Sequence, residues 1–175
     1  MLILLTGGSG SGKSVYAEKL CLELPAPHYY IAALQTEGDG GAEKIACNRR
    51  LHSEQGFTTI ERPRDLAGLV LPARGTALLE CICHLTANEM FAPGAFCNPT
   101  DKVLAGVAAL AEQCTHLLVV TNDVGSDGAY AQADELTQAY VRALGQINAA
   151  LAERADAVYE LVCGIPVLMK GGAAE

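Results

Sequence analysis

The chain has 175 residues, half of them hydrophobic, and its 12 basic and 20 acidic residues give a formal net charge of −8 at pH 7. This length allows one domain with a buried core, and the acidic balance argues against a general nucleic-acid binder. No apolar run approaches the ~20 residues that span a bilayer, and the opening "MLILLTGG" lacks the basic region of a signal peptide, so we expect a soluble cytoplasmic protein.

Short apolar runs alternate with helical patterns along the chain. The runs that predict strands cover residues 2–5, 29–32, 57–60, 76–81, 116–121 and 158–162. The patterns that predict helices cover residues 13–24, 41–54, 84–91, 101–114 and 131–155. This alternation is typical of a mostly parallel sheet with helices on both faces. We therefore predict a single three-layer α/β domain over residues 1–175.

The seven cysteines are odd in number and form no C-x-x-C pair. Cys81 and Cys83 are two residues apart at the end of a predicted strand, but the sequence supplies no further ligands beside them. This spacing argues against a zinc site. We expect reduced thiols that pack as small apolar side chains.

The strongest local signal is "GGSGSGKS", which matches the phosphate-binding pattern G-x-x-x-x-G-K-S/T between a predicted strand and a predicted helix. Its glycines let successive backbone N–H groups point at phosphate oxygens, beside the favourable dipole of a helix N-terminus. The lysine is expected to reach the β- and γ-phosphates, and the last serine to bind Mg²⁺. The predicted nucleotide-binding residues of this loop are Gly7, Gly8, Ser9, Gly10, Ser11, Gly12, Lys13 and Ser14.

A phosphate-binding loop needs an acidic partner that holds magnesium directly or through water. Glu80 ends the apolar strand "TALLE", and strand carboxyl ends face the ligand crevice in open α/β sheets. Asp123 in "VVTNDVG" is the second candidate, with an Asx turn beside Asn122 as the equally weighted structural explanation. His84 follows Glu80 closely and either faces the same crevice or contacts backbone at a helix start.

These residues indicate a nucleotide-binding domain for phosphoryl transfer. The guanine-reading element N-K-x-D is missing at the expected place, because "TNDV" has no lysine, and the chain is short for an ATPase motor. We therefore favour a small-molecule kinase over a GTPase or a motor.

Six segments in this order, "ILLTGGSGSGKSVYAE", "YYIA", "GFTTIERP", "ALLECICHLTANEMF", "VVTNDVG" and "LGQINAALAERADAVYELVCGIPVLMKG", together resemble the adenosylcobinamide kinase / adenosylcobinamide-phosphate guanylyltransferase family of cobalamin biosynthesis. The resemblance covers nearly the whole chain. It implies a RecA-like fold and a bifunctional, Mg²⁺-dependent enzyme. Such an enzyme phosphorylates adenosylcobinamide with ATP or GTP and then transfers GMP from GTP to that phosphate through a phosphoramidate on a histidine.

The resemblance also implies a homotrimer with the corrinoid bound between subunits. Carried over by position, Glu61 and Glu80 match acidic residues of the nucleotide site. Ala33, Leu34 and Gln35 match the segment that lines the site after the second strand.

The segment "KIACNRRLHSEQGF" departs from the family at its nucleophile. Aligned on Lys44 and Ile45, the position of the guanylylated histidine is Asn48, and an amide nitrogen cannot form a phosphoramidate. His52 lies four residues later, on the same face of the expected helix. Arg49 and the adjacent Arg50 are candidates to clamp triphosphate oxygens, or they form a solvated basic face.

Three interpretations of this segment stay open. His52 replaces the missing nucleophile; the guanylyl step is lost and a kinase or a nucleotide-binding protein remains; or His52 is a solvated helix residue without a role in the chemistry. The predicted catalytic residues are thus Lys13, Glu80 and His52. The alternative functions are a P-loop kinase of another small molecule and a nucleotide-binding protein that has lost catalysis.

Overall fold

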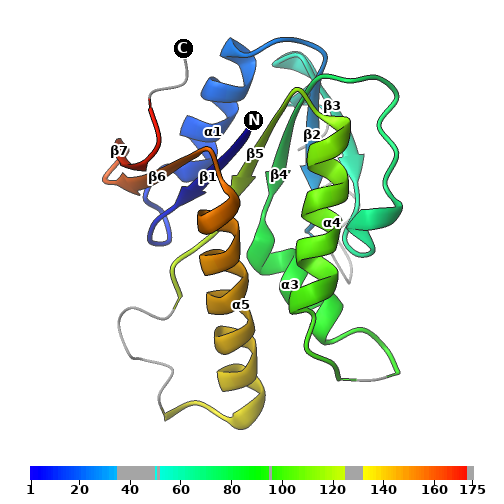
Figure 1. Ribbon diagram of the computed structural model, residues 1–175, viewed down its shortest axis with the longest axis vertical. Helices are drawn as coiled ribbons and strands as arrows, with labels where there is room; N and C mark the ends of the chain where they lie inside the picture. Colours follow the sequence, from blue (N-terminus) through cyan, green and yellow to red (C-terminus); the bar gives the residue numbers. More distant parts are fainter. Residues whose placement is uncertain (35–49, 51, 95, 125–131, 173–175) are drawn as a thin grey trace.

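A seven-stranded sheet runs through the part of the chain that the computed structural model describes, residues 1–34, 50, 52–94, 96–124 and 132–172 (Figure 1). The strands are β1 (Leu2–Thr6), β2 (His28–Ala32), β3 (Phe57–Glu61), β4 (Thr76–Glu80), β5 (His116–Val120), β6 (Ala157–Val162) and β7 (Ile165–Lys170). Their order is β3-β2-β4-β5-β1-β6-β7. Every neighbouring pair is parallel except β6 and β7, which are antiparallel.

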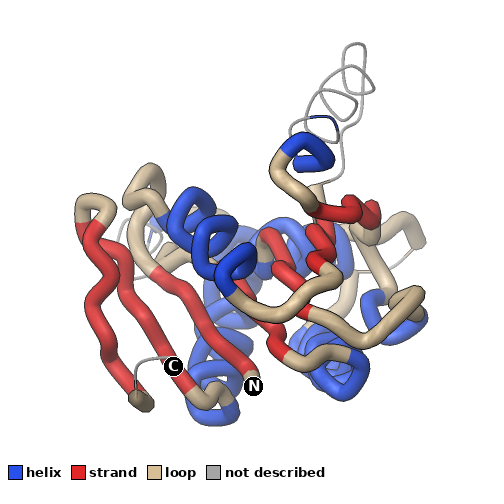
Figure 2. The backbone as a smooth tube through the Cα atoms, turned by 90° about the horizontal axis from the view of Figure 1, so that it is seen from above, coloured by secondary structure: helices blue, strands red, loops and turns tan. Residues whose placement is uncertain are grey.

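Helices cover both faces of this sheet, so the predicted three-layer α/β fold is confirmed (Figure 1). One face is covered by α1 (Lys13–Glu23). The other carries α3 (Ile82–Met90), α4 (Thr100–Gln113) and α5 (Glu135–Arg154), with a short 3-10 turn at Leu66–Gly68 packed beside α4. Figure 2 shows the sheet from above, between these helices. None of the helices in the described ranges is long and apolar enough to cross a membrane.

The two cores follow from the alternation of side chains along each buried strand. In β1, Ile3 and Leu5 pack on the α1 side, whereas Leu4 packs on the side of the other three helices. All three are almost completely buried, because neighbouring parallel strands and helices enclose both faces. This arrangement explains why the inner strands read as continuous apolar runs rather than as alternating patterns.

The last strand was not predicted from the sequence. Cys163 and Gly164 form a two-residue turn with φ angles of 50° and 81°, and β7 returns antiparallel to β6. Every residue of β7 is exposed, so its apolar letters mark an edge strand rather than a core strand. Of the helix predicted at 41–54, residues 50 and 52–54 are helical, and the remainder up to residue 49, with residue 51, lies outside the described residues.

Candidate functional site

The phosphate-binding loop connects β1 to α1 at the carboxyl edge of the sheet. Gly7 has a φ angle of 140°, and a Cβ atom there would lie 2.6 Å from the carbonyl oxygen of Leu161. Gly12, with φ 93°, stands directly before α1 and would bring a Cβ to 3.2 Å from Gly164 Cα. Glycine is required at both positions because the backbone is left-handed or nearly so and other chain segments approach closely.

Lys13, the first residue of α1, turns its side chain back into the loop. Its Nζ donates to the carbonyl oxygens of Gly7 at 2.9 Å and Gly8 at 2.7 Å, and lies 3.4 Å from Ser11 Oγ. The side chain is 6% exposed, and burial lowers the pKa of its ammonium group. The loop thus concentrates a positive charge and the N-terminus of α1 in one place, which favours binding of a polyphosphate.

Ser14 and Glu80 meet although 66 residues separate them. The Ser14 hydroxyl donates to Glu80 Oε1 at 2.5 Å. Glu80 reaches this place because β4 and β1 are parallel with only β5 between them, so the carboxyl ends of the two strands lie at the same edge. The other carboxylate oxygen, Oε2, is buried and has no hydrogen-bond partner among the described residues.

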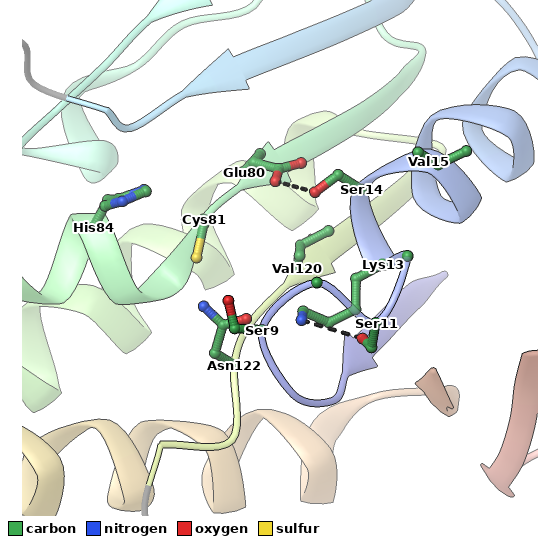
Figure 3. Close-up of a pocket in the computed structure, with 12 residues that line it drawn as sticks. Ser9, Ser11, Lys13, Ser14, Val15, Glu80, Cys81, His84, Val120 and Asn122 are labelled. Carbon is green, nitrogen blue, oxygen red and sulfur yellow. Dashed lines mark hydrogen bonds between the residues drawn. The ribbon is translucent and has the colours of Figure 1, made fainter. Parts of the chain in front are cut away.

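The loop, β4 and β5 enclose a cavity of about 410 Å³, drawn in Figure 3. His84 and Asn122 also line this cavity, with Asn122 drawn beside Ser9 of the loop and His84 farther from it in Figure 3. The next residue, Asp123, is not among the lining residues; its backbone N–H instead approaches Gly7 O at 3.4 Å. The residues that line the cavity are Ser9, Gly10, Ser11, Gly12, Lys13, Ser14, Val15, Glu80, Cys81, His84, Val120 and Asn122.

Sequence reasoning did not find Cys81 and Asn122. Cys81 is buried in the core, as expected of a small apolar side chain, and its thiol also points into the cavity in Figure 3. Asn122 was given only a turn role, whereas it follows β5 at the carboxyl edge, and its own carbonyl is held by Asn148 Nδ2 at 3.1 Å. Their positions could have indicated this, since Cys81 is one residue and Asn122 two residues past the end of a strand whose carboxyl end faces the crevice.

The predicted residues Ala33, Leu34 and Glu61 lie beside β2 and β3 and are not among the lining residues of this cavity. Ala33 is fully buried, and its N–H donates to Glu80 O at 2.9 Å, so the segment after β2 is tied to the end of β4. Gln35 and Arg49 lie outside the described residues. Gly7 and Gly8 belong to the loop through their carbonyl contacts with Lys13.

Asn88 of α3 holds the ends of β2 and β3 together. Its Nδ2 donates to the carbonyl oxygens of Ala33 at 2.7 Å and Pro63 at 3.0 Å. We expect Asn88→Ala to lower the free energy of unfolding by about 2 kcal/mol, because two partly buried acceptors lose their donor. Thermal melting tests this expectation. Asn88→Asp should be at least as harmful, since a carboxylate would face two carbonyls; an unchanged melting temperature in both variants would contradict the assignment.

His52 lies outside the cavity, next to α1. Its ring stacks on Tyr30 with 3.7 Å between centroids and an interplanar angle of 24°. Its Nε2 lies 3.9 Å from Glu18 Oε1, and the side chain is 13% exposed. Burial lowers the pKa of the imidazole, which favours the neutral form. Glu18 is one helical turn after Ser14 on α1, which corresponds to about 6 Å along the helix axis.

The loop suits a magnesium–nucleotide complex. A hydroxyl and a carboxylate with one unpartnered, buried oxygen offer the hard oxygen ligands and the water-binding group that Mg²⁺ prefers. Within the described ranges there is no cluster of three or more His, Cys, Asp or Glu side chains able to hold a metal ion. Ser14 Oγ and Glu80 would supply two ligands at most, and phosphate and water oxygens would supply the others, as is usual in phosphoryl transfer.

A parallel sheet, a glycine-rich loop before a helix, and a carboxylate at the end of a second strand define a P-loop nucleotide-binding domain. The sequence model of the family described as "Cobinamide kinase / cobinamide phosphate guanyltransferase" matches residues 3–169. The chain therefore belongs to the cobinamide kinase / cobinamide phosphate guanyltransferase family, as the resemblance implied.

Two relatives with known names match this chain over nearly their whole length. The "Bifunctional adenosylcobalamin biosynthesis protein CobU" of Salmonella typhimurium is 32% identical, with 97% of this chain and 100% of the relative covered. CobP of Pseudomonas aeruginosa, which carries the same description, is 29% identical, with 96% of each chain covered.

Solved structures share the fold at much lower identity. The ATPase domain of G40P has a TM-score of 0.58 at 10% identity, with 99% of this chain and 78% of that one covered. The flagellar accessory protein FlaH of Methanocaldococcus jannaschii has a TM-score of 0.53 at 14% identity, with 98% and 78% covered. At these identities the likeness establishes the RecA-like fold alone, which is the predicted fold class.

Proposed function

We propose that this chain transfers the γ-phosphoryl group of ATP or GTP to the aminopropanol hydroxyl of adenosylcobinamide. The contact between Ser14 and Glu80 beside the buried Lys13 carries the proposal, because it joins a metal ligand, a carboxylate and a phosphate-binding cation in one cavity. The family assignment supports the corrinoid as acceptor. It also supports a cytoplasmic homotrimer with the corrinoid between subunits.

Each residue has a distinct role in this reaction. Backbone N–H groups of the loop and the Lys13 ammonium bind the β- and γ-phosphates and stabilise the charge that develops on them. Ser14 Oγ binds Mg²⁺, which would neutralise phosphate charge when bound. Glu80 would help to hold Mg²⁺ through Oε2, directly or by way of water, or it accepts the proton of the acceptor hydroxyl.

Phosphorylation is tested directly with adenosylcobinamide and ATP or GTP labelled at the γ-phosphate. We expect label in the corrinoid with at least one nucleotide and only when Mg²⁺ is present. Nucleotide binding without labelled corrinoid would support the alternative, a nucleotide-binding protein that has lost catalysis. Label in a different small molecule would support a kinase with another acceptor.

We further propose that His52 carries the guanylyl group in the second reaction of the family. Two observations support this role: burial lowers the pKa of the imidazole, and Nε2 lies 3.9 Å from Glu18 Oε1 on α1, the helix that follows the phosphate-binding loop. The other ring nitrogen, Nδ1, is buried and has no hydrogen-bond partner among the described residues. The step therefore requires His52 to shift relative to α1, because a nucleophile must come within ~3.5 Å of the phosphorus.

We expect GTP labelled at the α-phosphate to leave acid-labile, alkali-stable label on the parent protein and none on His52→Ala. Burial lowers the pKa of His116 as well, yet His116 opens β5 away from the loop, so His116→Gln should label like the parent. Asn48→His should increase labelling by restoring the usual family residue. Absence of label in the parent, together with label in Asn48→His, would show that this chain has lost the guanylyl step and would overturn the role of His52.

A further inference from the structure

The segment that follows β5 lies between the phosphate-binding loop and Glu80. Strand β5 pairs with β1 on one side and with β4 on the other, and all three strands are parallel, so their carboxyl ends meet at one edge of the sheet. The loop follows β1, and Glu80 ends β4. Asn122, two residues past the end of β5, lines the cavity and is drawn beside Ser9 of the loop in Figure 3.

Backbone hydrogen bonds fix this segment against the phosphate-binding loop. The N–H of Thr121 donates to the carbonyl oxygen of Leu5 at 2.9 Å, and the N–H of Asp123 approaches that of Gly7 at 3.4 Å. Asn122 lies between these two contacts and is half-buried. Its backbone is therefore held in a defined place relative to the loop on both sides of the residue.

Asn148 of α5 holds the same segment from the opposite side. Its Nδ2 donates to the carbonyl oxygen of Asn122 at 3.1 Å, and its Oδ1 accepts from the hydroxyl of Thr121 at 2.7 Å. The orientation of the Asn148 amide follows from these partners, because a backbone carbonyl can only accept. Thr121 is fully buried, so this connection between α5 and the wall of the cavity is shielded from water.

The chemistry of the cavity wall favours a role for the Asn122 amide. The γ-phosphoryl group of a nucleotide on the loop needs hydrogen-bond donors on the side that faces away from the loop. On that side Glu80 repels phosphate, and Cys81 and Val120 offer no strong donor. His84 is exposed and lies farther from the loop in Figure 3. The Asn122 amide donates at any pH, and it does not pair with a carboxylate as a cation would.

We propose that Asn122 is a further catalytic residue of phosphoryl transfer, whose Nδ2–H donates to an oxygen of the γ-phosphoryl group, and that Asn148 is its positioning residue. This role rests on the proposed kinase function. In the reaction the bond from the γ-phosphorus to the acceptor oxygen forms, the bond to the β–γ bridging oxygen breaks, and the acceptor proton leaves to Glu80 or to water. The amide keeps its own protons and stabilises the charge on the transferred group.

Asn122→Ala tests the contact in two ways, because a nucleoside diphosphate lacks the γ-phosphoryl group. We expect kcat for phosphorylation of adenosylcobinamide to fall by roughly 10²-fold, as for other preorganised donors. Calorimetry with Mg²⁺ should show a non-hydrolysable ATP or GTP analogue bound about tenfold more weakly, with ADP or GDP bound as by the parent. A parental kcat in an active enzyme, or equal weakening of both classes of nucleotide, would overturn the proposal.

The binding measurement separates this proposal from the kinase function. A parent protein without kinase activity would refute the proposed function, and the ratio of triphosphate to diphosphate affinity would still decide whether Asn122 contacts the γ-phosphate. Asn98→Ala is the matched control. Asn98 accepts from the N–H of Thr100 at 3.1 Å and is not among the residues that line the cavity. It should keep the parental kcat and affinity ratio; a changed ratio there would mean that loss of any amide produces the effect.

The positioning role of Asn148 is tested with a double-mutant cycle. Asn148→Asp keeps the acceptor for Thr121 but has no donor for the carbonyl oxygen of Asn122. We expect it to lower kcat less than Asn122→Ala does, and to lower kcat no further when Asn122 is already alanine. Thr121→Val, which removes the hydroxyl that holds Asn148, should behave in the same way and serves if Asn148→Asp does not fold. Additive losses of kcat in the double variants would overturn the positioning role.

Discussion

Lys13→Ala is expected to reduce phosphorylation of adenosylcobinamide by roughly 10²–10³-fold, because removing one preorganised donor from a developing oxyanion costs that much. The loss should appear mainly in kcat, with a smaller increase in the KM for nucleotide, since loop N–H groups and the dipole of α1 remain. Steady-state kinetics with the labelled nucleotide and corrinoid measure both. A kcat within a factor of three of the parent would remove Lys13 from the catalytic residues.

Lys19 of the same helix is the matched control. It is 76% exposed and lies 4.0 Å from Glu23, so Lys19→Ala removes an α1 lysine without touching the loop. We expect Lys19→Ala to have the kcat and KM of the parent, because an exposed ion pair of this kind contributes little to stability. Equal losses in the two variants would mean that Lys13→Ala acts through the stability of α1 rather than through phosphate binding.

Glu80→Gln is expected to lower kcat by roughly 10²-fold, because general-base catalysis by a positioned side chain typically contributes 10²–10⁴-fold. The amide keeps the size of the side chain and an acceptor for Ser14, so binding of nucleotide should change little. Mg²⁺ titration separates the two roles of Glu80: a raised requirement for Mg²⁺ assigns Oε2 to metal-bound water, and an unchanged one assigns it to the acceptor hydroxyl.

Glu112→Gln provides the comparison for Glu80. Glu112 is an exposed residue of α4. The substitution makes the same change of charge on the surface, so parental kcat and Mg²⁺ dependence are expected. Parental kinetics in Glu80→Gln as well would show that the carboxylate acts on neither metal nor acceptor, and its contact with Ser14 would then be structural.

The fold could be predicted where burial determines the sequence pattern. Each of the six predicted strands is present, and the helices after residue 80 begin and end within four residues of the predicted bounds. Completely buried strands appear in the sequence as continuous apolar runs, and turn residues mark both ends of each run clearly. Strand β7 was missed because its turn has cysteine where asparagine or aspartate normally signals a hairpin.

The residues of the site could be predicted where they lie at the ends of predicted strands. Ser14 and Glu80 could be paired from sequence because the carboxyl ends of parallel strands share one edge. The thiol of Cys81 could not be assigned to the cavity from the sequence. The alternation of side chains along a strand does not determine the direction of a side chain beyond the last paired residue. Within the described residues Cys21, Cys81, Cys83 and Cys114 are buried, as expected of thiols that pack as small apolar side chains, whereas Cys97 and Cys163 are exposed.

The turn between β6 and β7 completes the phosphate loop, although about 150 residues separate the two segments in the chain. Gly164 donates its N–H to the carbonyl oxygen of Ser11 at 2.8 Å, and Leu161 limits the space beside Gly7. During synthesis the ribosome releases the loop about 150 residues before this support. A nascent chain that stops before residue 157 is therefore expected not to retain nucleotide, so nucleotide binding marks the end of folding rather than its beginning.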